Sequence, residues 1–238
     1  MKHKWVLRIF FAAAIALGLV ILWVYRTSIV NGGRVPGTAQ VNNDGPSCSS
    51  IDLDVAVKRL SEGWDTSGKI TKPLIEASNQ SLVCRKAIIG GLMHAMDKPE
   101  INFFSDESSY YLWSNGSAIL GQLKATEALD LLISHLDLSD GLFSASMVHR
   151  PAIHGVEAMG SLAVPKLVVA LKENPNRNIR LAAALCLADI AGAQADAALL
   201  AALKSEKDEC VRRFIELCFE PPTAEVLQQR FLAFRCGN

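Results

Sequence analysis

The pattern of apolar and polar positions divides the chain into three parts. Residues 9–25 carry no charged side chain, and residues 27–50 are rich in Gly, Pro, Asn and Ser. Beyond residue 50, leucine recurs at i and i+4 between polar turns, which is typical of amphipathic helices. We therefore predict a membrane segment at 1–26, a flexible linker at 27–50 and an all-α domain at 51–238.

The first segment is long enough to cross a membrane. Counted from Trp5 to Tyr25 it has 21 residues, which at about 1.5 Å per residue spans a bilayer core of about 30 Å. Lys2, Lys4 and Arg8 lie on its N-terminal side. The positive-inside rule then predicts a cytoplasmic N-terminus and an extracytoplasmic C-terminal domain. No small-x-small cleavage site follows closely after Tyr25, which favours an uncleaved signal anchor. A cleaved signal peptide is the alternative.

Two segments of the helical part repeat with an offset of 32 residues. The corresponding pairs are Leu167 and Leu199, Leu171 and Leu203, Ile179 and Val211, Arg180 and Arg212, and Cys186 and Cys218. Each unit predicts two helices joined by a polar turn, and one such hairpin cannot cover its own apolar faces. We expect neighbouring hairpins to stack, with Arg180 and Arg212 bonding to the adjacent turns and fixing the stacking.

The segment 178–192, "NIRLAAALCLADIAG", is the most apolar predicted helix of these repeats. A helix with so few charged residues must be covered on most sides. Its small residues are predicted to let the neighbouring helices approach closely. They are Ala182, Ala183, Ala184, Ala188 and Ala191.

These residues resemble the HEAT-like repeat family, especially the short repeats named after phycobilisome lyases. The resemblance rests on "NIRLAAALCLADIAG" and, in part, on "ECVRRFIELCF", and it extends over about residues 107–220. It implies an α-solenoid of stacked helical hairpins. Because the family includes pigment lyases, a lyase-like or other enzyme subunit that binds a small molecule is the alternative to a scaffold. HEAT-like iron hydroxylases use His-Glu pairs, and none of the five His here is followed by Glu.

The charge distribution argues against a nucleic-acid-binding function. The whole chain has 24 basic and 24 acidic residues. Four of the basic residues, Lys2, Lys4, Arg8 and Arg26, lie in or beside the acid-free N-terminal segment, so the rest of the chain carries about −4. The sequence has no zinc spacing, P-loop or nucleophile elbow. We expect no catalysis, no cofactor and no metal, and predict a membrane-anchored scaffold that binds a protein partner.

Two groups of residues are candidates for that binding. His149, Arg150 and His154 form the densest polar group and follow a long loop, where binding residues are often found. A polar helix start is the alternative for this group. Tyr110 and Trp113 belong to an aromatic segment typical of partner surfaces, for which a local core is the alternative.

The six cysteines predict two disulfides if the domain is extracytoplasmic, where such bonds persist. An antiparallel hairpin around Pro221 and Pro222 would return Cys236 to Cys210. Elimination then pairs Cys48 with Cys84. Cys186 and Cys218 are predicted to stay free, because adjacent helices lie about 8–10 Å apart, too far for a bridge.

Overall fold

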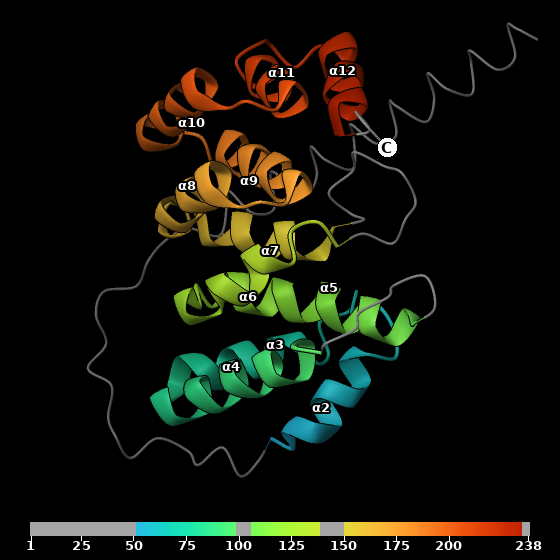
Figure 1. Ribbon diagram of the computed structural model, residues 1–238. Helices are drawn as coiled ribbons and strands as arrows, with labels where there is room; N and C mark the ends of the chain where they lie inside the picture. Colours follow the sequence, from blue (N-terminus) through green and yellow to red (C-terminus); the bar gives the residue numbers. More distant parts are fainter. Residues whose placement is uncertain (1–50, 99–105, 139–149, 235–238) are drawn as a thin grey trace, which may run out of the picture. The chain divides into compact units, whose positions relative to one another are not determined.

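A computed structural model describes residues 51–98, 106–138 and 150–234 of the chain (Figure 1). All the described residues belong to one compact unit of the chain. The described residues form α-helices and short 3-10 turns without any β-strand, which confirms the predicted all-α class. The predicted membrane segment 1–26 and linker 27–50 lie outside them.

The helix bounds follow the polar turns of the sequence. The α-helices are α2 Leu53–Leu60, α3 Thr71–Gln80, α4 Leu82–Met96, α5 Glu107–Gln122, α6 Leu129–Ser134, α7 Pro151–Met159, α8 Val164–Glu173, α9 Arg177–Ile190, α10 Ala193–Ser205, α11 Glu209–Cys218 and α12 Ala224–Phe234. Many begin at a short polar side chain that accepts a hydrogen bond from a backbone N–H of the first turn. These N-caps are Asp52, Ser81, Asp106, Asn176 and Asp208.

The later helices pack in two rows. Helices α5, α7, α9 and α11 are successive neighbours in one row, and α6, α8 and α10 are successive neighbours in the other (Figure 1). Helix α9 also packs against α8 and α10, and α12 closes the series by packing on α11. Helices α9 and α11 begin at Arg177 and Glu209, which keeps the 32-residue offset of the sequence.

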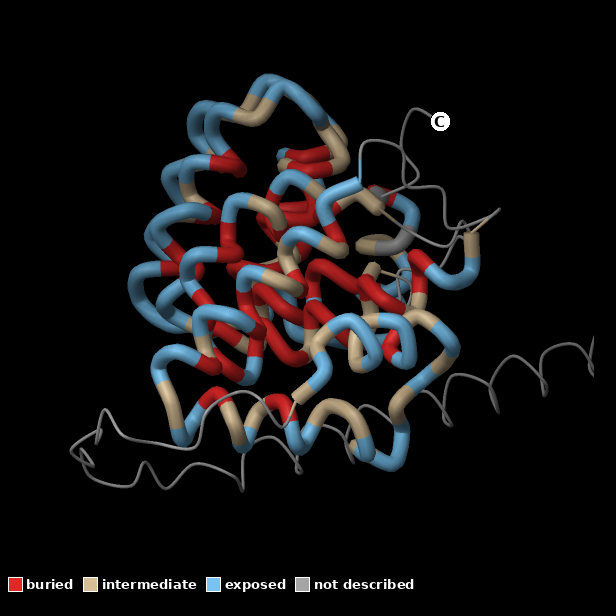
Figure 2. Tube along the Cα trace, turned by 90° about the horizontal axis from the view of Figure 1, so that it is seen from below, coloured by how far each residue is buried: buried red, intermediate tan, exposed pale blue. Residues whose placement is uncertain are grey.

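Helix α9 is covered on most of its circumference, as its composition predicts. Ala182, Ala183 and Ala184 are fully buried, and Figure 2 shows that buried segments gather where the helices face one another. Ala188 is half-buried. The prediction that Ala191 belongs to the packed surface is wrong, because α9 ends one residue earlier and Ala191 is an exposed cap residue with φ of 54°.

A close helix–helix contact joins α5 to α7 and depends on two glycines. A Cβ added to Gly155 would lie 2.7 Å from the carbonyl oxygen of Ser117. A Cβ added to Gly121 would lie 2.6 Å from the carbonyl oxygen of Gly155. Both distances are shorter than any normal contact of a carbon atom, and the obstacle is backbone in each case. The two helices therefore approach closely only because both positions lack a side chain.

Helix length and composition bear on the membrane prediction only within the described ranges. No single helix there is long and apolar enough to cross a membrane, and one bent pair, 151–162 with α8, passes on length and composition alone. The predicted span lies outside these ranges and stays a prediction.

Candidate functional site

The predicted polar group His149, Arg150 and His154 is only partly described. His154 is exposed on α7, and His149 lies outside the described residues. Arg150 is the residue before α7, and its guanidinium donates to the carbonyl oxygen of Leu136 at 3.4 Å. Burial lowers the pKa of Arg150, and the nearby Asp137 carboxylate partly offsets this. Arg150 thus contacts the backbone just after the end of α6.

The predicted aromatic pair separates into two environments. Trp113 is 1% exposed and lies against the His135 ring, with ring centroids 4.7 Å apart. Trp113 is therefore a core residue, which is the local-core alternative that the sequence left open for this aromatic segment. Tyr110 is also nearly buried, but it lies beside an exposed aromatic side chain that the sequence analysis missed.

That side chain is Trp64, which with Tyr110 and Tyr111 forms what we call the aromatic corner. The Trp64 ring meets Tyr110 at a centroid distance of 5.6 Å and Tyr111 at 5.9 Å, nearly perpendicular to each. Such edge-to-face arrangements are favourable for aromatic pairs. Trp64 is 49% exposed. The corner therefore presents an aromatic surface to its surroundings.

A buried asparagine holds the backbone around Trp64. The Asn115 side-chain amide donates to the carbonyl oxygens of Leu60 and Gly63, both at 2.8 Å. Its oxygen accepts a hydrogen bond from the Asp65 N–H at 3.3 Å. Asn115 is 7% exposed, so these bonds are shielded from water. The residues on both sides of Trp64 are thus fixed to α5.

Asp65 fixes the same segment to α3. Its carboxylate accepts hydrogen bonds from the backbone N–H groups of Lys69, Ile70 and Thr71, at 2.7–3.0 Å. Burial raises the pKa of Asp65, but these hydrogen bonds outweigh burial and leave the pKa below its ordinary value. An ionised Asp65 at the start of α3 also interacts favourably with the helix dipole. Trp64 is therefore presented on a segment held at both ends.

The edge of the aromatic corner at the start of α5 is acidic. Glu107 is exposed and lies four residues before Tyr111, on the same face of α5. Hydrogen bonds from Ser108 and Ser109 lower the pKa of Asp106 to about 2, so this carboxylate is ionised at neutral pH. The corner thus combines an exposed aromatic ring with fixed negative charge.

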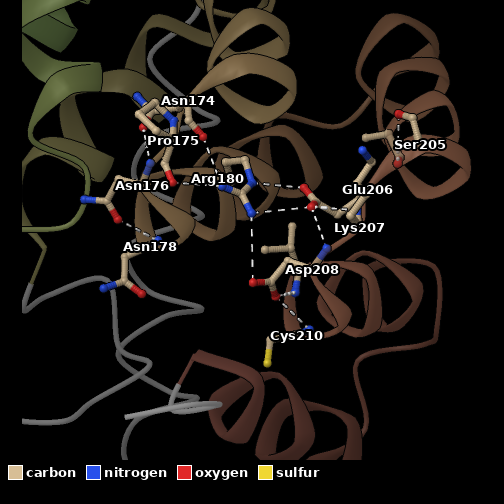
Figure 3. A network of polar contacts seen from close by, with 12 residues as sticks. Asn174, Pro175, Asn176, Asn178, Arg180, Ser205, Glu206, Lys207, Asp208 and Cys210 are labelled. Carbon is tan, nitrogen blue, oxygen red and sulfur yellow. Dashed lines mark hydrogen bonds and ion pairs between the residues drawn. The ribbon is translucent and has the colours of Figure 1, made fainter.

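Arg180 joins two successive turns, as predicted (Figure 3). Its guanidinium donates to the carbonyl oxygens of Asn174 and Pro175, at 3.0 and 3.2 Å, in the turn before α9. It also donates to Glu206 at 3.0 Å and lies 4.0 Å from Asp208, in the turn before α11. Arg180 therefore ties the α8–α9 hairpin to the α10–α11 hairpin.

Arg212 does not repeat this arrangement. Its side chain is exposed, with no ion pair or hydrogen bond to any other described residue. The prediction of a stacking role is wrong for Arg212, because the described residues after α11 form α12 and none of them pairs with its guanidinium. A different contact links the earlier segments. Asn176, in the turn between α8 and α9, donates a hydrogen bond to Asp137, which follows α6, at 2.7 Å.

The cysteines fall into two classes. Cys186 and Cys218 are free, as predicted. Burial raises the pKa of both thiols, that of Cys218 to about 12, which makes them poor nucleophiles. Cys84 and Cys210 are disulfide-bonded. Their predicted partners, Cys48 and Cys236, lie outside the described residues, so both pairings stay predictions.

Two acids meet between α7 and α9. Burial raises the pKa of Glu157 well above its ordinary value, and the charge and hydrogen bonding of Asp189 raise it further. One oxygen of Glu157 is buried with no hydrogen-bond partner. No group of three or more His, Cys, Asp or Glu residues in the described ranges could hold a metal ion. The acid pair therefore lacks the donor set of a metal site.

No protein-family model, curated protein or solved structure matches this chain. The functional assignment therefore rests on the geometry described above, in which the aromatic corner is the most distinctive exposed feature.

Proposed function

We propose that the chain is a membrane-anchored helical-repeat scaffold, an α-solenoid of the HEAT-like type, that binds a protein partner outside the cytoplasm. The observation that carries the proposal is the aromatic corner. Tryptophan and tyrosine are enriched among the residues that dominate protein–protein binding energy. A half-exposed Trp64 on a segment held by Asn115 and Asp65 meets a partner with little loss of conformational entropy.

The helical rows support the repeat part of the proposal. Hairpins α8–α9 and α10–α11 keep a 32-residue offset and are tied through Arg180. Stacked repeats of this kind offer long surfaces for binding. The free thiols of Cys186 and Cys218, with their raised pKa values, do not suit nucleophilic catalysis.

The apolar run 9–25 supports the anchor, and the cysteines support an oxidising compartment. A scaffold tethered by residues 27–50 stays near the membrane, since a flexible linker of that length has a root-mean-square span of about 25–30 Å. We propose that the disulfides Cys48–Cys84 and Cys210–Cys236 cross-link the two ends of the helical domain.

Site-specific photocrosslinking in intact membranes tests the proposal. A photoreactive amino acid replaces Trp64 in the full chain, and the matched control replaces Leu162, which is equally exposed at 50%. We expect one discrete protein adduct from position 64 that is absent from position 162. Equal labelling from both positions, or no protein adduct from position 64, would contradict a partner-binding role for the aromatic corner.

The anchor is tested separately by washing the same membranes with carbonate. We expect the full chain to remain in the membrane fraction with residues 1–26 attached. Release of a protein that begins near residue 26 or 40 would show cleavage of the segment and refute the anchor.

A further inference from the structure

We propose that the aromatic corner binds the cationic head of a Lys or Arg side chain, so that the partner presents a basic segment to this surface. The proposal rests on the proposed function and specifies the chemistry of the partner. It joins the exposed ring of Trp64 to the carboxylates at the start of α5.

The ring supplies the first half of the interaction. A tryptophan face is the best aromatic acceptor for a cation within about 6 Å of its centroid. Both tyrosines meet Trp64 nearly perpendicular to it, so neither is stacked flat on its ring. Tyr111 is half-buried, so part of its side chain adds to the exposed aromatic surface.

The carboxylates supply the second half. Two adjacent carboxylates, those of Asp106 and Glu107, lie at the start of α5. Asp106 is partly neutralised by Lys98, whose charge contributes to its lowered pKa. Glu107 has no ion-pair partner among the described residues, and it lies one helical turn from Tyr111. A cation at the corner would therefore gain an aromatic face and an unpaired carboxylate together.

The negative charge at the start of α5 favours a basic peptide over a nucleic acid, an anionic lipid or an apolar partner. Nucleic acids and anionic lipids would meet repulsion from Glu107 and Asp106. A purely apolar partner would leave these carboxylates desolvated without compensation. A basic segment alone matches both the ring and the charge.

Peptide binding to the full chain in detergent tests the inference. The probe is a fluorescent octapeptide of alternating Gly and Arg, and the matched probe replaces each Arg with citrulline, which keeps the shape and removes the charge. We expect the Arg peptide to bind, and the citrulline peptide to bind at least about tenfold more weakly. Raising the salt concentration should weaken only the Arg peptide.

Variants locate the site. We expect Trp64→Ala to weaken Arg-peptide binding at least about tenfold, the usual scale for an aromatic anchor. Trp64→Phe keeps an aromatic ring and serves as the second variant if Trp64→Ala does not fold. It should weaken Arg-peptide binding about two- to fivefold. Glu107→Gln should weaken binding and reduce its salt dependence, while Leu162→Ala, at a matched exposed position, should leave it unchanged.

Equal affinity for the two peptides, or unchanged affinity of both Trp64 variants, would overturn the inference. The inference would also be overturned if these variants changed binding to anionic vesicles but did not change binding to the Arg peptide. A protein adduct from position 64 combined with no Arg-peptide binding would retain the scaffold function and reject only the cationic partner. Arg-peptide binding without any adduct would reject the scaffold assignment instead.

Discussion

Replacing Gly155 with Ala would put a methyl group where α7 touches α5. The added carbon would lie 2.7 Å from the Ser117 carbonyl oxygen and 3.1 Å from the Ser117 Cβ. Helix backbone cannot turn away as a long side chain can, so the helices must separate. Overpacking of this kind costs about 1–3 kcal/mol. Alanine returns about 0.5–1 kcal/mol through its better helix propensity. We expect a net loss of about 1–2 kcal/mol in the free energy of unfolding.

Gly90→Ala is the matched control, since Gly90 lies within α4 and has no atom within 4 Å of an added Cβ. It should gain about 0.5–1 kcal/mol from helix propensity alone. Gly116→Ala gives an intermediate case, because its obstacle is the flexible Met96 side chain. Urea unfolding of the full chain in detergent, followed by circular dichroism, measures all three. If Gly155→Ala were as stable as Gly90→Ala, the close α5–α7 contact would be refuted.

Three further predictions concern α7, α9 and their turns. Ala184→Leu should destabilise the domain by about 1–3 kcal/mol through overpacking, and an unchanged urea midpoint would place Ala184 at the surface. Arg180→Ala should lower the free energy of unfolding by about 1–3 kcal/mol, because it leaves Glu206 largely buried without its cation. Arg213→Ala is the control and should lower it by less than about 1 kcal/mol, because the Arg213 side chain is 51% exposed. Glu157 has a raised pKa in the folded state, so the parent should lose stability as the pH rises above the ordinary value of 4.5. Glu157→Gln should lack this loss, and its advantage in urea titrations should grow with pH; a pH-independent difference would contradict the raised pKa.

The repeat could be predicted because its signals are local. The 32-residue offset, the alanines of α9 and the contacts of Arg180 all follow from residues within one hairpin or its neighbour. The aromatic corner could not be predicted in the same way. Trp64 meets Tyr110 through a fold in which Asn115 bonds to Leu60 across 55 positions of sequence. No short-range pattern encodes that contact.

Burial explains the other differences between the sequence analysis and the structure. Trp113 and Tyr110 lie three residues apart in an aromatic segment, which suits a surface or a core equally well. Only the neighbouring helices decide that α5 is buried on almost every side. Arg212 illustrates the limit of reasoning from the 32-residue offset, because the described residues after α11 form the single helix α12 and offer Arg212 no turn like the one that holds Arg180.

The exposed Arg212 provides a contact point for one more helical hairpin, which protein engineering could insert after α11. Arg180 is held by an acidic turn 26 positions later, at Glu206. Arg212 has the same place in its own hairpin but no such turn after it. A hairpin inserted between α11 and α12, with Glu and Asp in its turn, would give Arg212 the partners that Arg180 already has. Within the described residues, the start of α12 directly after α11 is therefore what leaves Arg212 without a following acidic turn.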